Sequence, residues 1–329
     1  MQRSQILNRV QNIQNNKDFE MVAMDLFKFQ AEHCEVYKNY LHFLSKSPGS
    51  VQSIVEIPFL PIEVFKKHAV KSGDWDEQII FTSSGTTGME VSKHFVKDLS
   101  LYEWSFLNGF EKFYGNPANW TILALLPSYL ERKGSSLIYM AEKLIGISND
   151  KRSGFFLNDH KELARVLKAL VAENKQTLLL GVTFGLLDFA EDFELDLQEV
   201  VVMETGGMKG RREEWTRDQV HEILKKQWNI NKIHSEYGMT ELLSQAYSIG
   251  DGIFKTPEWM KVLWRDTSDP LLTSDVAGSG GLNVIDLCNV DSCAFIATQD
   301  LVKIQGNGSF EVMGRFDHSD VRGCNLLVV

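Results

Sequence analysis

Short apolar runs alternate with longer segments of helical periodicity along most of this chain, and any fold must bury both kinds of segment in one core. The strand-like runs cover residues 78–81, 120–126, 177–181 and 200–203. The segments with apolar residues at helical spacing cover residues 99–114, 136–145, 159–173 and 213–228. Strands joined through helices are usually parallel neighbours, because each helix returns the chain to the same sheet edge. The alternation therefore predicts an α/β fold with a mainly parallel sheet flanked by helices.

The pattern differs at the two ends of the chain. Residues 19–44 carry apolar side chains at near-helical spacing until Pro48-Gly49 interrupts it. From residue 253 onward, short strand-like runs alternate with Gly-rich turns at 278–281 and 306–308. We therefore expect three units in chain order: an N-terminal helical segment, 1–49, an α/β nucleotide-binding region, 50–252, and a β-rich subdomain, 253–329.

The net charge and the cysteine count narrow the classes of function. The formal charge of −10 argues against nucleic acid as a partner, because proteins that bind the phosphate backbone usually present a basic face. The N-terminus has no apolar run typical of a signal peptide, and no stretch of about 18 uncharged apolar residues occurs, so we expect a cytoplasmic protein without a transmembrane segment. Four scattered cysteines, with no histidine at zinc-ligand spacing, predict reduced thiols.

A loop of small and hydroxylated residues follows the apolar run at 78–81. It reads Thr82-Ser83-Ser84-Gly85-Thr86-Thr87-Gly88, and Lys93 begins the next apolar stretch. The glycines let backbone N–H groups turn inward while the hydroxyls and the lysine supply further donors, so the loop can bind phosphate oxygens. Its spacing differs from that of the P-loop, which disfavours P-loop NTPase chemistry. A hairpin rich in turn residues is the alternative interpretation.

This loop resembles the signature of the adenylate-forming enzymes, and three further segments resemble motifs of that superfamily in the same order. They are Glu204-Thr205-Gly206-Gly207-Met208, Glu236-Tyr237-Gly238-Met239-Thr240-Glu241, and Thr298-Gln299-Asp300 with Gly314-Arg315-Phe316-Asp317. Each segment alone also fits a turn or a solvated surface, but four matches in order are far more specific. One position departs from the pattern, since the superfamily usually has Gly where this chain has Gln299.

The resemblance implies ATP as a substrate and assigns its adenine and ribose to particular residues. The backbone of Gly206-Gly207-Met208 would lie against the adenine ring, and Tyr237, next to Gly238, would stack on that ring. The ribose hydroxyls would be bound by Asp300, with Arg315 contacting the same sugar.

The resemblance also implies a phosphate and metal site. The loop 82–88 and Lys93 would bind the phosphates, and Thr240 would donate to a phosphate oxygen. Glu241 would help to hold Mg²⁺, a hard cation that suits a carboxylate together with phosphate oxygens. Lys93, Thr240 and Glu241 are therefore the expected catalytic residues of the adenylation step.

The end of the chain points to one branch of the superfamily. Most of these enzymes continue past the Gly-Arg motif into a mobile lid with a catalytic lysine, whereas this sequence ends at Val329. That end, with residues 126–132, 283–287 and Arg322-Gly323-Cys324-Asn325, is similar to the acyl-protein synthetase family, whose best-known member supplies fatty acyl groups to the bacterial luminescence reductase. The similarity implies transfer of a fatty acyl group to Cys324, with a reductase or an acyl carrier as partner.

A thiol acceptor near the C-terminus agrees with the chemistry of the residues. An acyl-adenylate is a mixed anhydride, and a thiolate is the side chain best able to accept its acyl group at neutral pH. The charge of Arg322 would favour the thiolate form of Cys324. The alternative is that Cys324 is only a buried residue of a terminal strand, and Cys288 and Cys293 are expected in the core. Two other functions stay open: a ligase of the phenylacetate type that uses coenzyme A, and a non-catalytic nucleotide-binding subunit.

Overall fold

The computed structural model describes residues 2–83, 90–126, 134–206 and 215–316. The strands are β1 (Leu60–Pro61), β2 (Ile79–Thr82), β3 (Lys93–Val96), β4 (Thr121–Leu125), β5 (Gly154–Phe155), β6 (Thr177–Val182), β7 (Val200–Thr205), β8 (His234–Tyr237), β9 (Ala246–Ser248), β10 (Ile253–Lys255), β11 (Met260–Arg265), β12 (Thr273–Ser274), β13 (Gly278–Asp286), β14 (Phe295–Ile304) and β15 (Phe310–Arg315). The α-helices are α1 (Arg3–Val10), α2 (Asn16–His33), α3 (Glu35–Phe43), α4 (Val64–Lys67), α5 (Leu99–Tyr114), α6 (Ser136–Ile147), α7 (His160–Ala172), α8 (Thr183–Asp192) and α9 (Arg217–Trp228). Short 3₁₀ helices are η1 (Pro48–Ser50), η2 (Ile54–Glu56) and η3 (Pro117–Asn119).

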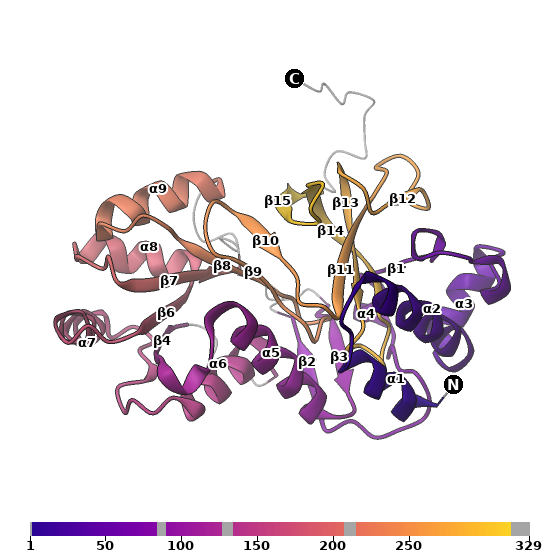
Figure 1. Cartoon of the computed structure of the whole chain (residues 1–329), viewed down its shortest axis with the longest axis horizontal. Helices are drawn as coiled ribbons and strands as arrows, with labels where there is room; N and C mark the ends of the chain where they lie inside the picture. Colours follow the sequence, from indigo (N-terminus) through magenta and orange to yellow (C-terminus); the bar gives the residue numbers. More distant parts are fainter. Residues whose placement is uncertain (1, 84–89, 127–133, 207–214, 317–329) are drawn as a thin grey trace.

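Thirteen strands of the described residues form one long sheet, and its two halves differ in direction. The order is β12-β11-β13-β14-β15-β10-β9-β8-β7-β6-β4-β5, with β1 paired to β14, while β2 and β3 form a separate hairpin. From β5 to β8 all neighbours are parallel. From β8 to β12 all neighbours on the path are antiparallel. The α/β fold predicted from the sequence, with a β-rich C-terminal part, is confirmed (Figure 1).

Helices cover both faces of the parallel half because its strands carry apolar residues on both faces. In β4, Leu123 and Leu125 pack with apolar residues of α7, α8 and α9, whereas Ile122 and Ala124 pack with those of α5 and α6. Alternate residues of a strand point to opposite faces, so continuous apolar runs are the expected pattern for a sheet covered on both sides. Helix α5 spans the residues that the sequence predicted. Each described helix is too short or too polar to span a bilayer.

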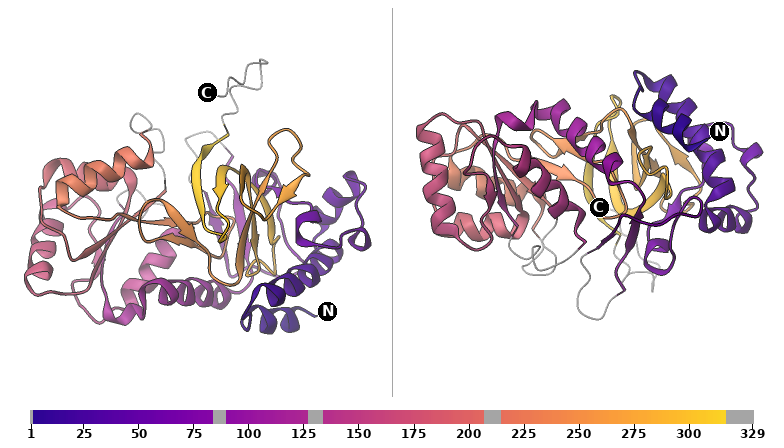
Figure 2. Two further views of the ribbon diagram at one scale, coloured as in Figure 1. Left: turned by 45° about the horizontal axis from the view of Figure 1, so that its top comes forward. Right: turned by 90° about the horizontal axis from the view of Figure 1, so that it is seen from below.

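The N-terminal helices pack against the β-rich half rather than standing apart from it (Figure 2). The side-chain amide of the buried Gln30 donates to the carbonyl of Asn289 at 2.7 Å and accepts from the backbone N–H of Ala294 at 2.9 Å. The rings of Phe27 and Tyr37 lie 6.0 and 6.1 Å from the ring of Phe295 in β14. These contacts place the predicted N-terminal segment and the β-rich half in one core. The domain boundaries at residues 49 and 252 stay predictions.

The prediction of a turn at residues 278–281 is wrong, because these residues begin β13. Each glycine there lies against a side chain or carbonyl of β11. A Cβ atom added to Gly278 would lie 2.5 Å from the indole nitrogen of Trp264, and one added to Gly280 would lie 2.2 Å from the carbonyl oxygen of Arg265. The glycines therefore allow close packing between strands, a use of glycine in strands that composition does not distinguish from a turn. The sequence patterns also did not predict α8.

Replacing Gly280 with Ala tests this packing. A methyl group cannot fit 2.2 Å from a backbone carbonyl, so β11 and β13 must shift, and we expect a loss of about 2 kcal/mol or more in the free energy of unfolding. Gly306→Ala is the matched control, because no atom lies within 4 Å of its added Cβ, and it should change the stability by less than about 0.5 kcal/mol. Urea denaturation measures both. Equal midpoints for the two variants would contradict the packing argument.

Candidate functional site

Three of the four segments that resemble nucleotide motifs follow the carboxyl ends of strands, since β2 ends at Thr82, β7 at Thr205 and β8 at Tyr237, whereas Thr298-Gln299-Asp300 lies within β14. Strands β7 and β8 are parallel neighbours in the long sheet, while β2 belongs to the separate hairpin. In open α/β sheets, ligands bind outside the carboxyl ends of the strands, so the end of β7 and β8 is the expected position of a site. The predicted residues Ser84, Gly85, Thr86, Thr87, Gly88, Gly207, Met208 and Cys324 lie outside the described residues.

The β2–β3 hairpin brings the expected phosphate lysine to the motif at 236–241. Thr82 pairs with Lys93, and the Lys93 side chain is exposed. On either side of this lysine, Ser92 hydrogen-bonds the carboxylate of Glu241, and His94 Nδ1 lies 2.9 Å from the carbonyl oxygen of Thr240. The two contacts hold the strand that carries Lys93 against the Thr240-Glu241 turn.

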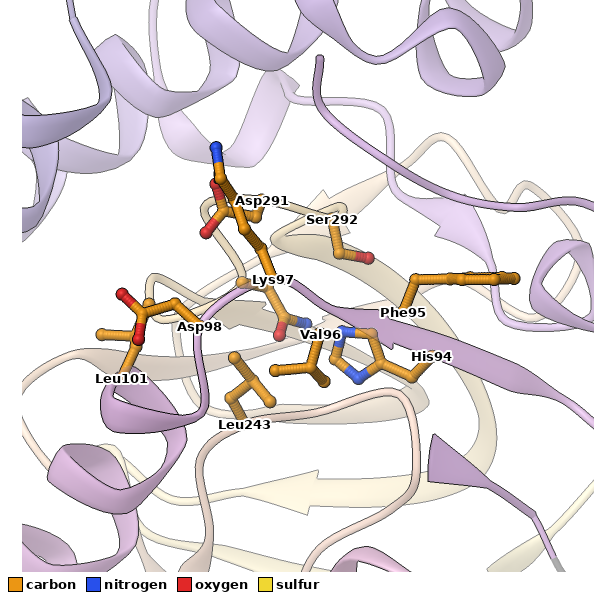
Figure 3. A pocket seen from close by; sticks show the side chains of 10 residues that line it. His94, Phe95, Val96, Lys97, Asp98, Leu101, Leu243, Asp291 and Ser292 are labelled. Atoms are coloured by element: carbon orange, nitrogen blue, oxygen red, sulfur yellow. The ribbon is translucent and has the colours of Figure 1, made fainter. Parts of the chain in front are cut away.

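His94 is a structural residue of this junction. Burial lowers the pKa of its imidazole to about 4, so the ring is neutral at pH 7 and its Nδ1–H can donate to the Thr240 carbonyl. The adjoining cavity is lined by His94, Leu243, Asn289 and Ser292 and has a volume of about 10 Å³ (Figure 3). Within the part of the chain that the structure describes, the side-chain oxygens of Asn289 and Ser292 are buried without a hydrogen-bond partner. A space of this size suits one water rather than a substrate.

Asp300 joins the two halves of the sheet. The hydroxyl of Tyr237 donates to Asp300 Oδ2 at 2.7 Å, and Arg315 Nε donates to Oδ1 at 2.9 Å. Asp300 is 6% exposed, whereas the Arg315 side chain is 70% exposed. Burial and the neighbouring Asp300 charge raise the pKa of Tyr237 well above its ordinary value, so the phenol stays protonated and donates. The two expected ribose residues are therefore in contact with each other and with the expected adenine residue.

Glu241, the expected magnesium ligand, is a buried carboxylate. It is 5% exposed, and burial raises the pKa of its carboxyl, although the Ser92 hydrogen bond and the charges of Arg315 and Lys66 oppose that rise. In the described part of the chain, no group of three or more side chains is arranged to hold a metal ion. Mg²⁺ in nucleotide sites is commonly bound by one or two carboxylates plus phosphate oxygens, and a single acidic side chain fits that pattern.

The turn at Gly206 rests on a buried network that sequence analysis missed. Gly206 has a φ of +73°, and its carbonyl accepts a hydrogen bond from the hydroxyl of Thr183. That hydroxyl also lies 3.0 Å from Glu204, which is paired with Arg217 of α9 at 3.3 Å. Burial opposes ionisation of Glu204, but His221 and Arg217 lower the pKa of its carboxyl below the ordinary value. Arg217 also donates to the carbonyl of Val312 in β15 at 3.1 Å, which ties this turn to the β-rich half.

Glu236 is a second buried acid, and sequence analysis named it within the motif at 236–241 without assigning it a role. It is 8% exposed and accepts a hydrogen bond from the hydroxyl of Thr205. Burial raises the pKa of its carboxyl to about 7, and the charge of Glu204 adds to the rise. A Cβ atom added to Gly238 would lie 2.3 Å from Glu236 Oε1, so the glycine of this motif is needed for close approach of the carboxylate. The sequence signal that could have identified Glu236 was an acidic residue within a buried strand.

Solved structures with a similar fold include a CoA ligase and an ATP-bound protein. A 2-hydroxyisobutyryl-CoA ligase in complex with 2-HIB-AMP and CoA superposes with a TM-score of 0.66 at 12% identity, over 93% of this chain and 70% of that one. ATP-bound MatB from Rhodopseudomonas palustris gives a TM-score of 0.53 at 14% identity, over 74% of this chain and 49% of that one. The chain has the fold of the adenylate-forming ligases.

The comparisons establish the fold and no finer class. The chain spans about half the length of the MatB structures that it matches. No protein-family model matches it, and the comparison with curated proteins finds no match. One fold can support many activities, so the activity of this chain must be argued from its site.

The raised pKa of Glu236 predicts a pH-dependent effect of Glu236→Gln on stability. Because the folded-state pKa of about 7 exceeds the ordinary 4.5, the carboxyl's contribution to stability is fully present below pH 4.5 and is lost as the pH rises through 7. The amide introduced by Glu236→Gln is neutral at every pH, so the variant does not lose stability as the pH rises. At pH 8 we expect the variant to be more stable by about 2 to 3 kcal/mol, and near pH 4.5 the difference should vanish.

Urea denaturation at the two pH values measures this difference. Glu222→Gln is the control, since Glu222 is an exposed glutamate on α9 and its replacement should shift neither midpoint. A Glu236→Gln variant that is less stable than the parent at pH 8 would show that the buried carboxylate is well compensated.

Proposed function

We propose that this chain activates a carboxylic acid with ATP, forming an acyl-adenylate and pyrophosphate, and then passes the acyl group to a thiol. The proposal rests on one observation above all. In a chain with the fold of the adenylate-forming ligases, the β2–β3 hairpin that carries Thr82 and Lys93 packs against the turn that carries Glu241. Tyr237, at the start of that turn, bonds Asp300 of β14. Convergence of these segments beside the carboxyl end of β8 favours nucleotide chemistry over a set of unrelated turns.

The adenylation step needs charge stabilisation rather than a base. The substrate carboxylate is already ionised, and its oxygen forms the new bond to the α-phosphorus of ATP while the bond to pyrophosphate breaks. Negative charge on the phosphates then requires donors and cations that are fixed in advance. Lys93 supplies an ammonium group and Thr240 a hydroxyl for this purpose. Mg²⁺, held by Glu241 and the phosphates, would neutralise further charge.

The ribose would be bound by Asp300. Its carboxylate is held by Tyr237 and Arg315, so both oxygens have a fixed orientation before a ligand arrives. Such preorganisation lowers the entropy lost when the sugar binds. The exposed Arg315 guanidinium can contact the same sugar while it remains paired with Asp300.

The acyl acceptor proposed here is Cys324, with a reductase or an acyl carrier as the next acceptor. The thiolate would attack the acyl carbonyl, the bond to the AMP oxygen would break, and AMP would leave. Of the four cysteines, Cys34, Cys288 and Cys293 are fully buried, and burial raises the pKa of each thiol. Buried thiols with raised pKa values are poor nucleophiles, which supports an acceptor elsewhere. The cytoplasmic location stays a prediction.

Coenzyme A is the second candidate acceptor. The neighbouring 2-hydroxyisobutyryl-CoA ligase binds CoA in a structure that covers 93% of this chain. If CoA is the acceptor, acyl transfer requires added CoA and leaves no adduct on the protein.

Acid-dependent exchange between pyrophosphate and ATP tests the adenylation step. We expect exchange that requires Mg²⁺ and one class of acid, tested over fatty, aromatic, hydroxy and amino acids. Glu241→Gln should lower the exchange rate at least about tenfold with a smaller change in ATP affinity, since the lost charge acts mainly on the transferring phosphate. If no acid in the panel supports exchange, the result would argue for a non-catalytic nucleotide-binding subunit. If Glu241→Gln leaves the exchange rate unchanged, the result would argue against the metal role of Glu241.

Acylation of Cys324 is tested by intact-mass measurement. Incubation with ATP and an accepted acid should leave an acyl adduct that hydroxylamine removes, because thioesters are cleaved by this nucleophile. Cys324→Ser should abolish the adduct and leave pyrophosphate exchange largely intact, whereas the control Cys34→Ser should retain the adduct. An adduct that survives Cys324→Ser, or thioester that forms only with added CoA, would place the acceptor elsewhere.

A further inference from the structure

Three neighbouring strands present polar side chains on one buried face beside the candidate site. Glu236 of β8 lies opposite Thr205 of β7 on one side and opposite Tyr247 of β9 on the other. Residues that are direct neighbours across strands point to the same face of the sheet. This is the face covered by α5, and the ring of Tyr114 at the end of α5 packs edge-on against Tyr247 at 5.5 Å. We call Glu236, Gln245 and Tyr247 the acidic cluster.

Two members of the acidic cluster have buried polar atoms without partners among the described residues. The hydroxyl of Tyr247 and Oε1 of Gln245 make no hydrogen bond within that part of the chain, and both residues are more than nine-tenths buried. Gln245 lies against Gly238, where a Cβ atom would meet Gln245 Cγ at 3.3 Å and Glu236 Oε1 at 2.3 Å. The Gln245 side chain and the Glu236 carboxylate therefore both lie beside the Cα of the same glycine. An unpaired buried polar atom is unfavourable, so the arrangement calls for a ligand or another function.

The carboxylate of Glu236 lacks a cation in the described part of the structure. No ion pair there involves Glu236, and its hydrogen-bond donor is the hydroxyl of Thr205. Its electrostatic neighbours are the acid Glu204 and the phenols of Tyr102, Tyr114 and Tyr247. A buried acid without a positive partner is poised to bind one.

The position of the cluster connects it to the proposed reaction. Thr205 is the last residue of β7, and Glu236 is followed directly by Tyr237, the last residue of β8. The cluster thus lies at the carboxyl edge of the sheet, between two segments that resemble nucleotide motifs. A group bound there would be close to the nucleotide, as the substrate of an adenylation reaction must be.

We propose that the acid activated by this chain carries an ammonium group, which the acidic cluster binds. This inference rests on the proposed adenylation and names its substrate class. An ammonium group has three donors, and the cluster offers three acceptors: the Glu236 carboxylate, Gln245 Oε1 and the Tyr247 hydroxyl. The ammonium group also supplies the positive charge that the buried Glu236 carboxylate lacks. A plain alkyl tail would satisfy none of these groups, and a hydroxyl would supply one donor and no charge.

This substrate class differs from the fatty acid that the sequence resemblance implies. A fatty chain would cover the carboxylate with methylene groups and leave it desolvated, which is unfavourable for a charged group. A site built to bind a polar group discriminates strongly against an analogue that lacks it, because its own polar atoms are then left unpaired. The cluster therefore favours amino-substituted acids over unsubstituted acids of equal length.

Pyrophosphate exchange with matched acids tests the substrate class. Each amino acid in the panel, with its amine at the α, β or terminal position, is compared with the hydroxy acid and the unsubstituted acid of the same length. We expect kcat/KM for the preferred amino acid to exceed that of both analogues by more than about tenfold. Glu236→Gln should reduce this preference at least about tenfold, and Tyr247→Phe should reduce it by a smaller factor. Glu222→Gln, on the exposed side of α9, should leave it unchanged.

Direct binding separates failure of this inference from failure of the adenylation proposal. Calorimetric titration of the same acids, without ATP, should show that the preferred amino acid binds the parent protein and binds Glu236→Gln more weakly by at least about tenfold. Exchange with unsubstituted or hydroxy acids that equals exchange with amino acids would overturn the ammonium assignment and leave adenylation standing. Binding of an amino acid that depends on Glu236, without exchange, would leave the assignment standing and overturn adenylation. If no acid supports exchange and no amino acid binds, both the ammonium assignment and the adenylation proposal are overturned.

Discussion

The carboxylate of Asp300 is the contact on which the geometry of the candidate site depends. Asp300 lies on β14, Tyr237 lies on β8, and three strands of the sheet separate them. A hydrogen bond of 2.7 Å between their side chains therefore requires the sheet to curl until the parallel half and the antiparallel half face each other. Arg315, paired with Asp300 across β14 and β15, supplies the charge that makes this buried carboxylate tolerable. Without this contact, the segments that resemble adenine and ribose motifs would have no common position.

Buried acids cluster around the candidate site more densely than a stable core would require. Glu204, Glu236, Glu241, Asp286 and Asp300 are each less than 9% exposed. The groups that stabilise these five acids differ from one acid to the next. Glu204 has a cation, and Asp286 accepts from the backbone N–H groups of Leu243, Ser244 and Cys288, which holds the chain that follows Glu241. Glu236 and Glu241 keep raised pKa values because burial outweighs their partners. Acids left poorly compensated in a fold are expected at functional sites, where binding a ligand or metal completes their surroundings.

The glycines show what a local sequence pattern can predict and what it cannot. The glycines at 278–281 and Gly238 have the composition of turns, yet each makes room for a neighbour that is distant in sequence or folded back in space. By contrast, the predicted turn at 306–308 is a turn, with Gly308 at a φ of +80° between β14 and β15. A left-handed turn and a crowded strand both exclude side chains, so the sequence alone shows that glycine is needed without showing why.

The sequence by itself determined part of the secondary structure of the α/β half, without α8 and β8, and the order of the candidate motifs. Helix α5 and the strands β4, β6 and β7 follow from apolar periodicity, because side chains at fixed spacing decide which face of an element is buried. The sequence also singled out Lys93, Glu241 and Asp300, since those residue types in that order resemble one chemistry. Only the tertiary structure decided that Asp300 meets Tyr237, that Ser92 and His94 hold the strand of Lys93 against the Thr240-Glu241 turn, and that Glu236, Gln245 and Tyr247 share a buried face. These contacts depend on strand register and on the curl of the sheet, which arise from packing of the whole chain and leave no local pattern in the sequence.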